Sequence, residues 1–377
     1  MYTRLIKVQE KKSFFLFGPR GTGKTTWLKQ NFPKALYLDL LEAELFNDLI
    51  ANPQRLQHLI PPHFKDWVIL DEVQKIPTLL DEVHRLIESQ NLKFVLTGSS
   101  ARKLKQNGVN LLAGRALTYH LYPFTALELK DDFSLKDSLQ FGHLPSIFKE
   151  EDKQKYLESY AMTYLQQEIQ QEGLTRQLAA FSRFLEAASF SNGQVLNVSE
   201  VARECNVHRK VVENYFSILE DLMLSYQLPI FSRRSKRKLL RHNKFYFFDV
   251  GVYRTFRPSG PLDSPEEKEG VALENLVFQE LKAVNDYLNL KYKLFYWRTP
   301  AQKEVDFILY GPRGLLALEV KRSGNVNPRD LRGLKSFLAD YPEAKPFLLY
   351  GNPKEQWVDG IHCLSVEKFL KEMKSYL

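Results

Sequence analysis

The sequence predicts an α/β protein that begins with a parallel sheet covered by helices on both faces. The first observation is that short apolar segments alternate with helical ones, an order typical of parallel sheets. The apolar segments are FFLFG (14–18), ALYLDL (35–40), WVILDE (67–72) and KFVLTGSS (93–100). The second observation is a glycine-rich loop directly after the first segment, and the third is a pair of carboxylates that ends the third segment.

The elements of this first domain can be assigned in order. The residues TTWLKQNF after the glycine-rich loop begin a helix, residues 41–60 are helical, and residues 78–90 form a further helix. The short apolar segment ALTYHLYPFTALEL follows the fourth strand. We therefore expect one domain over residues 1–128, in which strands and helices alternate.

Two regions follow this domain. Residues 129–196 are predicted to be helical, because aromatic and apolar residues recur at helical spacing, as at Tyr156, Tyr160 and Tyr164. Residues 197–257 change to short helices followed by strands. The middle of the chain is therefore expected to be a helical region and a small mixed domain.

The last third of the chain is predicted to be a separate α/β domain. The segment RPSGPLDSPEEKEG (257–270) is rich in proline, glycine and acidic residues, so we expect a linker or a mobile loop. Residues 271–377 then have the pattern of a helix, two or more strands, a helix and a strand. The sequence contains no internal repeat.

Composition limits the class of protein. The chain has 377 residues, 44% hydrophobic and 26% charged, which predicts two or three folded domains. The net charge of +8 favours nucleotide and nucleic acid as partners, although a generically basic protein remains an alternative. Cys205 and Cys363 form neither a disulfide framework nor a CxxC metal site. No apolar run reaches the roughly 18 residues of a membrane span, so we expect a cytoplasmic protein that does not contact the membrane.

The glycine-rich loop matches GxxxxGK[ST], the pattern of a phosphate-binding P-loop. Its glycines let backbone amides surround phosphates, and the following helix offers its positive end. Lys24 is expected to reach the β- and γ-phosphates of ATP, and Thr25 to bind Mg²⁺. The expected nucleotide-binding residues of this loop are Gly18, Pro19, Arg20, Gly21, Thr22, Gly23, Lys24, Thr25 and Thr26.

The carboxylate pair at the end of WVILDE predicts hydrolysis. Asp71 is expected to hold Mg²⁺, and Glu72 to polarise the attacking water. Such a pair alone is moderately specific, but an upstream P-loop in a parallel sheet makes it a strong signal. It also separates hydrolases from small-molecule kinases, which need no adjacent glutamate.

Other polar residues are candidates for supporting roles. Thr97 and Ser99 end the fourth strand, where either hydroxyl would lie beside the γ-phosphate, although both could instead cap the next helix. Arg102 and Arg115 follow, and either could stabilise charge in the transition state, in its own subunit or in a neighbour's. A surface position remains the alternative for both arginines.

These motifs resemble those of a known family. FFLFGPRGTGKTT, VILDEVQKIPTLL, VLTGSSARKL and LAGRALTYHLYPFTALEL are similar to the AAA-superfamily ATPases of bacteria and archaea. The segments KFYFFDVGVYR, GVALENLVFQEL, YWRTPAQKEVDFIL and LALEVKRS resemble the C-terminal domain of unknown function that accompanies them. The resemblance implies an AAA-type fold and Mg²⁺-ATP as ligand. Proteins of this type commonly assemble, so a homo-oligomer is an open expectation.

The middle of the chain fits a winged helix-turn-helix. NVSEVAREC and HRKVVENYFSILEDL are predicted to be its two helices, with Asn206 and Val207 as the turn. His208, Arg209 and Lys210 would meet a DNA groove. A basic wing would follow, with Arg233, Arg234, Lys236, Arg237, Lys238, Arg241 and Lys244. The alternative is a module that binds protein.

The C-terminal domain resembles the core of the PD-(D/E)xK phosphodiesterases. Asp306 and Glu319 would lie on adjacent strands and bind Mg²⁺, and Lys321 would point to the same face as Glu319. Glu274 could orient a metal-bound water from a helix. The ExK pattern is a weak motif, and a structural ion pair is the alternative.

Three functions fit the sequence. The favoured one is an ATPase whose hydrolysis switches or drives a DNA-associated complex. The second is a metal-dependent nuclease gated by ATP. The third is a non-catalytic ATP-binding regulator that acts through protein contacts. Loss of hydrolysis in Glu72→Gln would support the first, and cleavage lost in Asp306→Ala would support the second.

Overall fold

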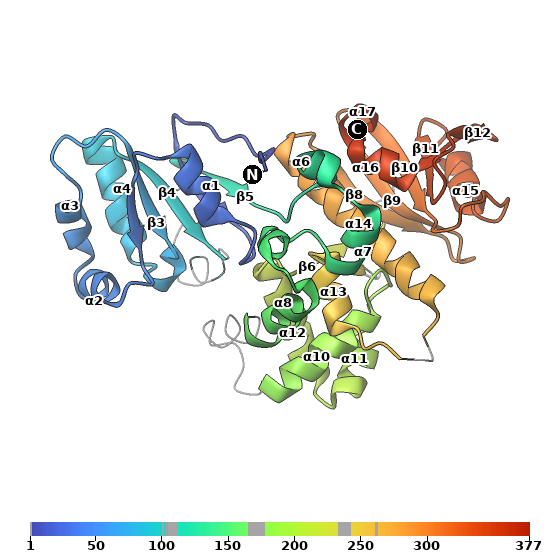
Figure 1. The fold of residues 1–377 in the computed structure, drawn as a ribbon, viewed down its shortest axis with the longest axis horizontal. Coiled ribbons are helices and arrows are strands. Elements are labelled where there is room, and N and C mark those ends of the chain that lie inside the picture. Colours follow the sequence, from blue (N-terminus) through green and yellow to red (C-terminus); the bar gives the residue numbers. More distant parts are fainter. Residues whose placement is uncertain are drawn as a thin grey trace. The chain divides into compact units, whose positions relative to one another are not determined.

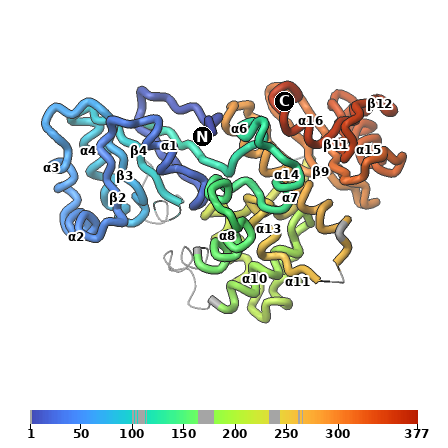
Figure 2. Tube along the Cα trace, viewed as in Figure 1, coloured from blue at the N-terminus to red at the C-terminus, as the bar shows by residue number. Residues whose placement is uncertain are grey.

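The protein divides into two compact units. The structure is a computed structural model that describes residues 2–99, 102, 104, 112, 114–164, 178–232, 243–260 and 263–377. The N-terminal unit contains Ile6–Pro123 and Asp221–Met223. The second unit contains Met1–Leu5, Phe124–Glu220 and Leu224–Leu377. Figures 1 and 2 show the course of the chain through each unit.

The N-terminal unit is built on a five-stranded parallel sheet with the strand order β2-β3-β4-β1-β5. Its strands are β1 (Ser13–Phe17), β2 (Leu36–Asp39), β3 (Trp67–Asp71), β4 (Lys93–Gly98) and β5 (Ala116–His120). Every residue of β1 and β3 is buried, as expected for central strands covered on both faces. The order places β4 between β1, which leads into the glycine-rich loop, and β3, which ends in Asp71.

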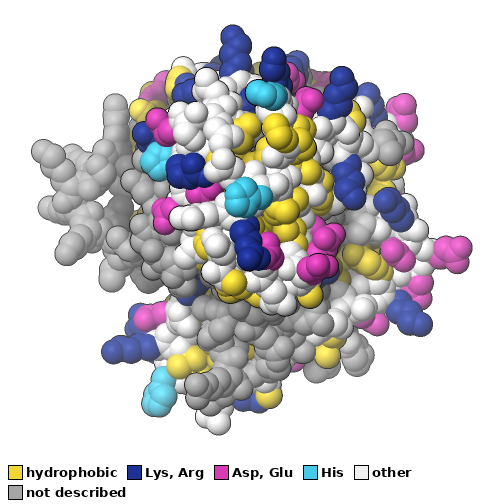
Figure 3. All heavy atoms as spheres, turned by 90° about the vertical axis from the view of Figure 1, so that its left-hand side faces the viewer, with side chains coloured by type: hydrophobic (Ala, Val, Ile, Leu, Met, Phe, Trp, Pro, Cys, Tyr) yellow, Lys and Arg dark blue, Asp and Glu magenta, His cyan; other side chains and the backbone are white. Residues whose placement is uncertain are grey.

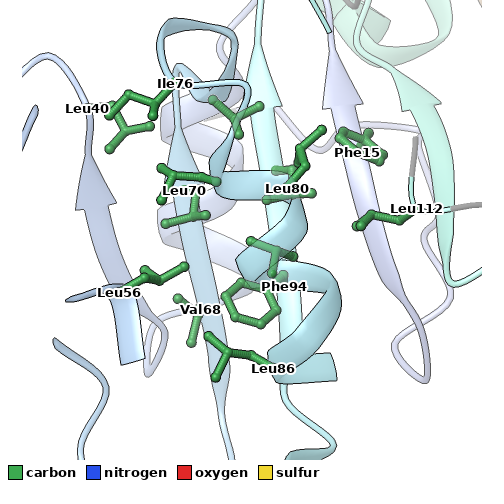
Figure 4. Packing of buried hydrophobic residues seen from close by; sticks show 14 of the residues in the cluster. Phe15, Leu40, Leu56, Val68, Leu70, Ile76, Leu80, Leu86, Phe94 and Leu112 are labelled. Atoms are coloured by element: carbon green, nitrogen blue, oxygen red, sulfur yellow. The ribbon is translucent and has the colours of Figure 1, made fainter. Parts of the chain in front are cut away.

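Helices cover this sheet and complete its core (Figure 1). They are α1 (Lys24–Asn31), α2 (Ala43–Ala51), α3 (Leu56–Leu59) and α4 (Leu79–Gln90), with 3₁₀ turns at Pro53–Arg55 and Val73–Lys75. Figure 4 shows Leu80 and Leu86 of α4 beside Val68 and Leu70 of β3 and Phe94 of β4. Each of these side chains is at most 1% exposed, so α4 is held to the sheet by burial of apolar surface.

The second unit begins with short helices. They are α6 (Ala126–Leu129), α7 (Leu135–Phe141), α8 (Lys153–Ser159), a π-helical turn at Tyr160–Tyr164 and α10 (Leu178–Phe190), with 3₁₀ turns at Lys130–Asp132 and Pro145–Lys149. Side-chain hydroxyls and carboxylates begin several of these helices; Thr125, for example, forms a capping box with Glu128. The predicted helical region is therefore confirmed for the residues that the structure describes.

A helix-turn-helix and an antiparallel strand pair follow. These elements are α11 (Val198–Cys205), α12 (Arg209–Asp221), β6 (Ser225–Leu228) and β7 (Lys244–Phe247). Asn206 ends α11 in the left-handed conformation, which confirms the predicted turn. Phe184 of α10 packs against Tyr215 and Phe216 of α12, and Phe216 contacts Phe245 of β7. The face of α12 that carries Tyr215 and Phe216 therefore packs into the core.

The C-terminal part is a six-stranded mixed sheet with the order β12-β13-β11-β10-β9-β8. Its elements are α13 (Val250–Phe256), α14 (Pro265–Tyr287), β8 (Lys293–Arg298), β9 (Glu304–Gly311), β10 (Gly314–Val320), α15 (Arg332–Asp340), β11 (Lys345–Tyr350), β12 (Gln356–Val358), β13 (Ile361–Ser365), α16 (Val366–Lys371) and α17 (Met373–Tyr376). The predicted α/β class, with a parallel N-terminal sheet, a helical region and a C-terminal sheet domain, is confirmed.

The predicted linker over residues 257–270 is wrong in its second half. Helix α14 begins at Pro265, so residues 265–270 form its first turns. The Ser264 side chain accepts a hydrogen bond from the Glu267 amide, proline occupies the first turn, and Glu266 and Glu267 favour the positive end of the helix. The proline and acidic residues therefore start a helix.

The surface of the N-terminal unit is mixed in character. Figure 3, which faces the side of α2 to α4, shows hydrophobic side chains gathered among charged ones. Leu41, Ile50 and Leu59, in this segment of the chain, are 53%, 50% and 36% exposed. Among the residues described, no helix is both long and apolar enough to cross a membrane.

Candidate active site

The glycine-rich loop joins the end of β1 to the start of α1. Gly21 and Gly23 have φ angles of 80° and 85°, a region that disfavours other residues. A Cβ atom on Gly18 would lie 2.3 Å from the Leu121 carbonyl oxygen, so a larger residue could not replace it without a shift of the backbone. The glycines predicted from the motif are therefore required by the geometry of this chain.

Lys24 lies over the loop that precedes it. Its side chain is buried, and its Nζ donates hydrogen bonds to the carbonyl oxygens of Gly18 at 2.6 Å and Pro19 at 3.2 Å. Gly23 is the N-cap residue of helix α1, and no side chain caps this end of the helix. Because a helix leaves its first amides without an intrahelical acceptor, this end offers amide donors and a positive dipole beside the lysine.

Asp71 faces the start of α1 from the end of β3. The Thr25 Oγ1 donates a hydrogen bond to Asp71 Oδ2 at 3.2 Å, and the Glu72 amide donates to Asp71 Oδ1 at 3.1 Å. Asp71 is 6% exposed, so its position is fixed by the sheet and by these bonds. The structure thus brings together the two residues predicted to hold Mg²⁺.

Tyr37 is a residue of this site that the sequence did not reveal. It lies on β2 beside β3, and its hydroxyl donates a hydrogen bond to Asp71 Oδ2. Burial, and then the bond to Asp71, raises the pKa of the Tyr37 phenol, so the hydroxyl keeps its proton. Only the register of β2 against β3, which places Tyr37 opposite Ile69, could have indicated this contact.

Glu72 has a backbone conformation that is uncommon for its residue type. Its φ of 59° and ψ of 41° lie in the left-handed region, at the point where β3 turns into a 3₁₀ helix. The Gln74 side chain donates to the Glu72 carboxylate and lies 3.5 Å from Ser99 Oγ. Gln74 therefore links the predicted general base to the end of β4, a connection that the motif did not predict.

The structure distinguishes the two hydroxyls at the end of β4. Thr97 is completely buried and pairs in register with Leu16 of β1, so it lies between the loop strand and the acidic strand. Its Oγ1 is a buried atom without a hydrogen-bond partner among the described residues. Ser99 is 4% exposed and lies near Gln74. An unsatisfied buried hydroxyl at this position is suited to a water or a ligand oxygen.

Arg115 lies at the opposite end of the strands from the glycine-rich loop. It directly precedes β5, and Ala116 pairs with Ser13 at the beginning of β1, whereas the glycine-rich loop follows the end of β1. Arg115 forms an ion pair with Glu88. Within its own chain it is therefore remote from Lys24, and the predicted catalytic role would require a second copy.

The residues present fit Mg²⁺ and a nucleoside triphosphate. The donor set near Asp71 consists of hydroxyl and carboxylate oxygens, which Mg²⁺ prefers. The uncapped start of α1 and the lysine supply positive charge for phosphates. Gly18 leaves room for backbone to approach closely, and Thr97 offers an unsatisfied hydroxyl.

Comparison with known proteins agrees with this geometry. Residues 10–130 match a family model described as an AAA domain. The N-terminal domain is an AAA domain. Two domains of unknown function, DUF8612 and DUF4143, match residues 132–262 and 269–369. The AAA domain places this part of the chain in the P-loop NTPase superfamily.

The names of the similar proteins assign them no function. The chain is 26% identical over 347 residues to the uncharacterized protein Rv2008c of Mycobacterium tuberculosis, covering 89% of this chain and 75% of the relative. An uncharacterized protein of Haemophilus influenzae is 24% identical over 370 residues, covering 93% and 88%. The crystal structure of protein VC1899 from Vibrio cholerae aligns over 91% of this chain and 96% of that chain, at 13% identity and a TM-score of 0.24.

The predicted DNA-contacting residues of α12 lie on the surface. His208, Arg209 and Lys210 are exposed at the start of this helix, and Arg209 pairs with Glu213. Most of the predicted wing lies outside the described residues: Arg233, Arg234, Lys236, Arg237, Lys238 and Arg241. The interpretation of Lys244 as a wing residue is wrong, because this lysine is 2% exposed and faces the interior.

The second unit brings together the four residues of the predicted nuclease site. Glu274 lies on α14, Asp306 on β9, and Glu319 and Lys321 at the end of β10. Lys321 Nζ donates to Glu319 Oε1 at 2.6 Å, and the Val320 amide donates to Asp306 Oδ2 at 2.9 Å. Lys244, which the motif did not include, also lies in this cluster.

Proposed function

We propose that this protein is a Mg²⁺-dependent ATPase whose hydrolysis switches or drives a DNA-associated complex. The observation that supports the first half is the hydrogen bond between Thr25 and Asp71 at 3.2 Å, because it joins the P-loop helix to the acidic strand tip. That bond places a hydroxyl and a carboxylate where they can share one cation. Lys24 lies over the same loop.

Each residue has a distinct task in this proposal. Lys24 and the first amides of α1 neutralise the phosphates, and Thr25 and Asp71 hold the metal. The metal would supply charge that stabilises the phosphoryl group. Glu72 orients and deprotonates the attacking water, and Gln74 holds the Glu72 carboxylate through its side-chain amide. Thr97 offers its buried hydroxyl between the two strands.

The second half of the proposal rests on the helix-turn-helix. Three basic or titratable side chains, His208, Arg209 and Lys210, are exposed at the start of α12, where such a helix meets a groove. The net charge of the chain is +8. Phosphate contacts of this kind weaken as salt rises. Binding of the protein releases counterions from DNA, and this release is less favourable when the salt concentration is high.

Phosphate release with and without duplex DNA tests both halves in one preparation. We expect Mg²⁺-dependent turnover that DNA changes and that Lys24→Ala abolishes, because this variant no longer binds the phosphates. The double variant Arg209→Ala/Lys210→Ala should bring the ratio of turnover with and without DNA toward one. Lys345→Ala, which removes an exposed lysine on β11, is the control. Turnover that Lys24→Ala retains would contradict the ATPase, and a DNA effect that survives the double variant would contradict the role of α12.

A further inference from the structure

A partly buried group of carboxylates lies where α14 meets the C-terminal sheet. We call this group the acidic cluster; its members are Glu274, Glu304, Asp306 and Glu319. Asp306 and Glu319 are 6% and 7% exposed. Strands β9 and β10 are antiparallel with Leu318 opposite Phe307, a register that brings Asp306 and Glu319 side by side. Buried carboxylates require a compensating cation or a proton.

The ammonium group of Lys244 lies among these carboxylates. Its Nζ is 2.6 Å from Glu304 Oε1, 3.0 Å from Glu274 Oε1 and 3.4 Å from Asp306 Oδ1. Lys244 begins β7, so it reaches the cluster from the strand pair that follows the helix-turn-helix. Tyr246, two residues further along the same face of β7, donates to Glu274 Oε1 at 2.5 Å. Three carboxylates from two elements therefore converge on one cation.

Lys244 keeps its charge in this setting. The three carboxylate oxygens around its Nζ compensate the positive charge of the ammonium group. A permanent ammonium and a divalent ion cannot share this position, because Mg²⁺ needs the same oxygens at about 2.0–2.1 Å.

A second observation concerns Glu319. Its Oε2 is buried and has no hydrogen-bond partner in the described part of the chain, while its Oε1 accepts from Lys321. Lys321 therefore compensates the charge of Glu319 within the chain.

Side chains of the protein supply most of the positive charge of the cluster. Lys244 and Lys321 lie within it, and Arg298 Nε is 3.5 Å from Glu304 Oε2. These three cations face four carboxyl groups, so side chains of the protein itself compensate most of the negative charge of the described cluster. We propose that Lys244 is the resident cation of the acidic cluster, occupying a latent divalent-metal site and making the C-terminal domain metal-independent. The wild-type chain is then not expected to cleave DNA with a metal ion bound at this site.

Binding of Mn²⁺ to the full chain without nucleotide tests this proposal. Electron paramagnetic resonance counts the bound ions. Any Mn²⁺ held at the Thr25–Asp71 site adds the same number of ions to every variant. Lys244→Met should bind one more Mn²⁺ than wild type, because the carboxylates lose their cation while the apolar stem is kept. Adding Asp306→Asn to Lys244→Met should remove the extra ion. Lys282→Met, which removes a half-buried lysine from α14, the helix that carries Glu274, is the matched control and should bind no extra ion.

The wild-type chain gives an independent answer if Lys244→Met does not fold. Wild type and Asp306→Asn should bind the same number of Mn²⁺ ions, since Lys244 closes the site in both. An ion bound by wild type and lost in Asp306→Asn would overturn the proposal. A folded Lys244→Met chain that binds no additional Mn²⁺ would overturn it as well.

Discussion

At the scale of single residues, the site is defined by contacts that a motif does not contain. Asp71 accepts hydrogen bonds from Thr25, from Tyr37 and from the Glu72 amide, so both of its oxygens are oriented. Partners that orient a metal-binding carboxylate tune the affinity of the site. We therefore propose that Tyr37 is a positioning residue, which would act on a bound Mg²⁺ through Asp71.

Tyr37→Phe is expected to weaken the apparent affinity for Mg²⁺ about tenfold, at the lower end of what loss of an orienting partner produces. The phenyl ring keeps its packing while the hydroxyl that holds Asp71 is removed. The measurement is ATP turnover as a function of Mg²⁺ concentration. Tyr119→Phe is the control, because its hydroxyl lies on β5 and accepts from the Gln9 amide. An unchanged Mg²⁺ dependence in Tyr37→Phe would show that the hydroxyl does not act on the metal.

Glu319 predicts a dependence of stability on pH. Its usual pKa of 4.5 is raised to about 8 in the folded chain, so between these values the folded state holds a proton that the unfolded state releases. The free energy of unfolding should therefore fall as pH rises from 5 to 8. In Glu319→Gln this fall should be smaller, since the titrating group is gone.

Urea unfolding of the two chains at several pH values measures this slope. Glu343→Gln, which changes an exposed carboxylate on the loop before β11, should keep the wild-type slope. Equal slopes in wild type and Glu319→Gln would contradict the raised pKa.

At the scale of elements, the N-terminal strands could be predicted because each is a short apolar run between polar segments. The predicted segments 67–72 and 93–100 correspond to β3 at Trp67–Asp71 and β4 at Lys93–Gly98. The order of strands in the sheet could not be predicted, because it depends on long-range pairing. That order is what places Thr97 between the loop and Asp71.

Other elements were misread for local physical reasons. Residues 265–270 contain proline and glutamate, which also occur in linkers, but Ser264 caps them into α14. Lys244 follows a basic run in the sequence. In the structure it lies in the interior at the start of β7, where it forms ion pairs with carboxylates of α14 and β9. The sequence motif correctly grouped Glu274, Asp306 and Glu319. It did not indicate Lys244, which lies in the segment matched by DUF8612, outside the segment that carries the motif.

The cap of α14 gives a prediction at this scale. Ser264→Ala should lower the stability of the second unit by about 1 kcal/mol, because the Glu267 amide loses its acceptor. For a unit of this size that corresponds to a fall in melting temperature of about 2–4 °C. Ser264→Asp retains an acceptor and should melt close to wild type. Thermal melting followed by circular dichroism compares the three chains, and equal melting temperatures would refute the capping role.

At the scale of the whole molecule, the chain joins an AAA domain to a helix-turn-helix and a sheet domain. The AAA domain carries the residues that we propose for ATP binding and hydrolysis, and the second unit carries the exposed basic start of α12. Arg115 directly precedes β5, at the opposite end of the strands from the P-loop, so its participation would require a second copy of the chain. With Lys244 as the proposed cation of the acidic cluster, ATP hydrolysis is the reaction that we propose for this protein.

Glu72 provides the most direct test, because it separates hydrolysis from binding. Calorimetry with Mg²⁺-ATP and phosphate release are measured on wild type and Glu72→Gln in parallel. We expect the affinity for ATP to remain within a few fold of wild type and turnover to fall by about 10²–10⁴, the range of a general base. Equal turnover in the two chains, or a wild-type chain that binds no ATP, would contradict the account.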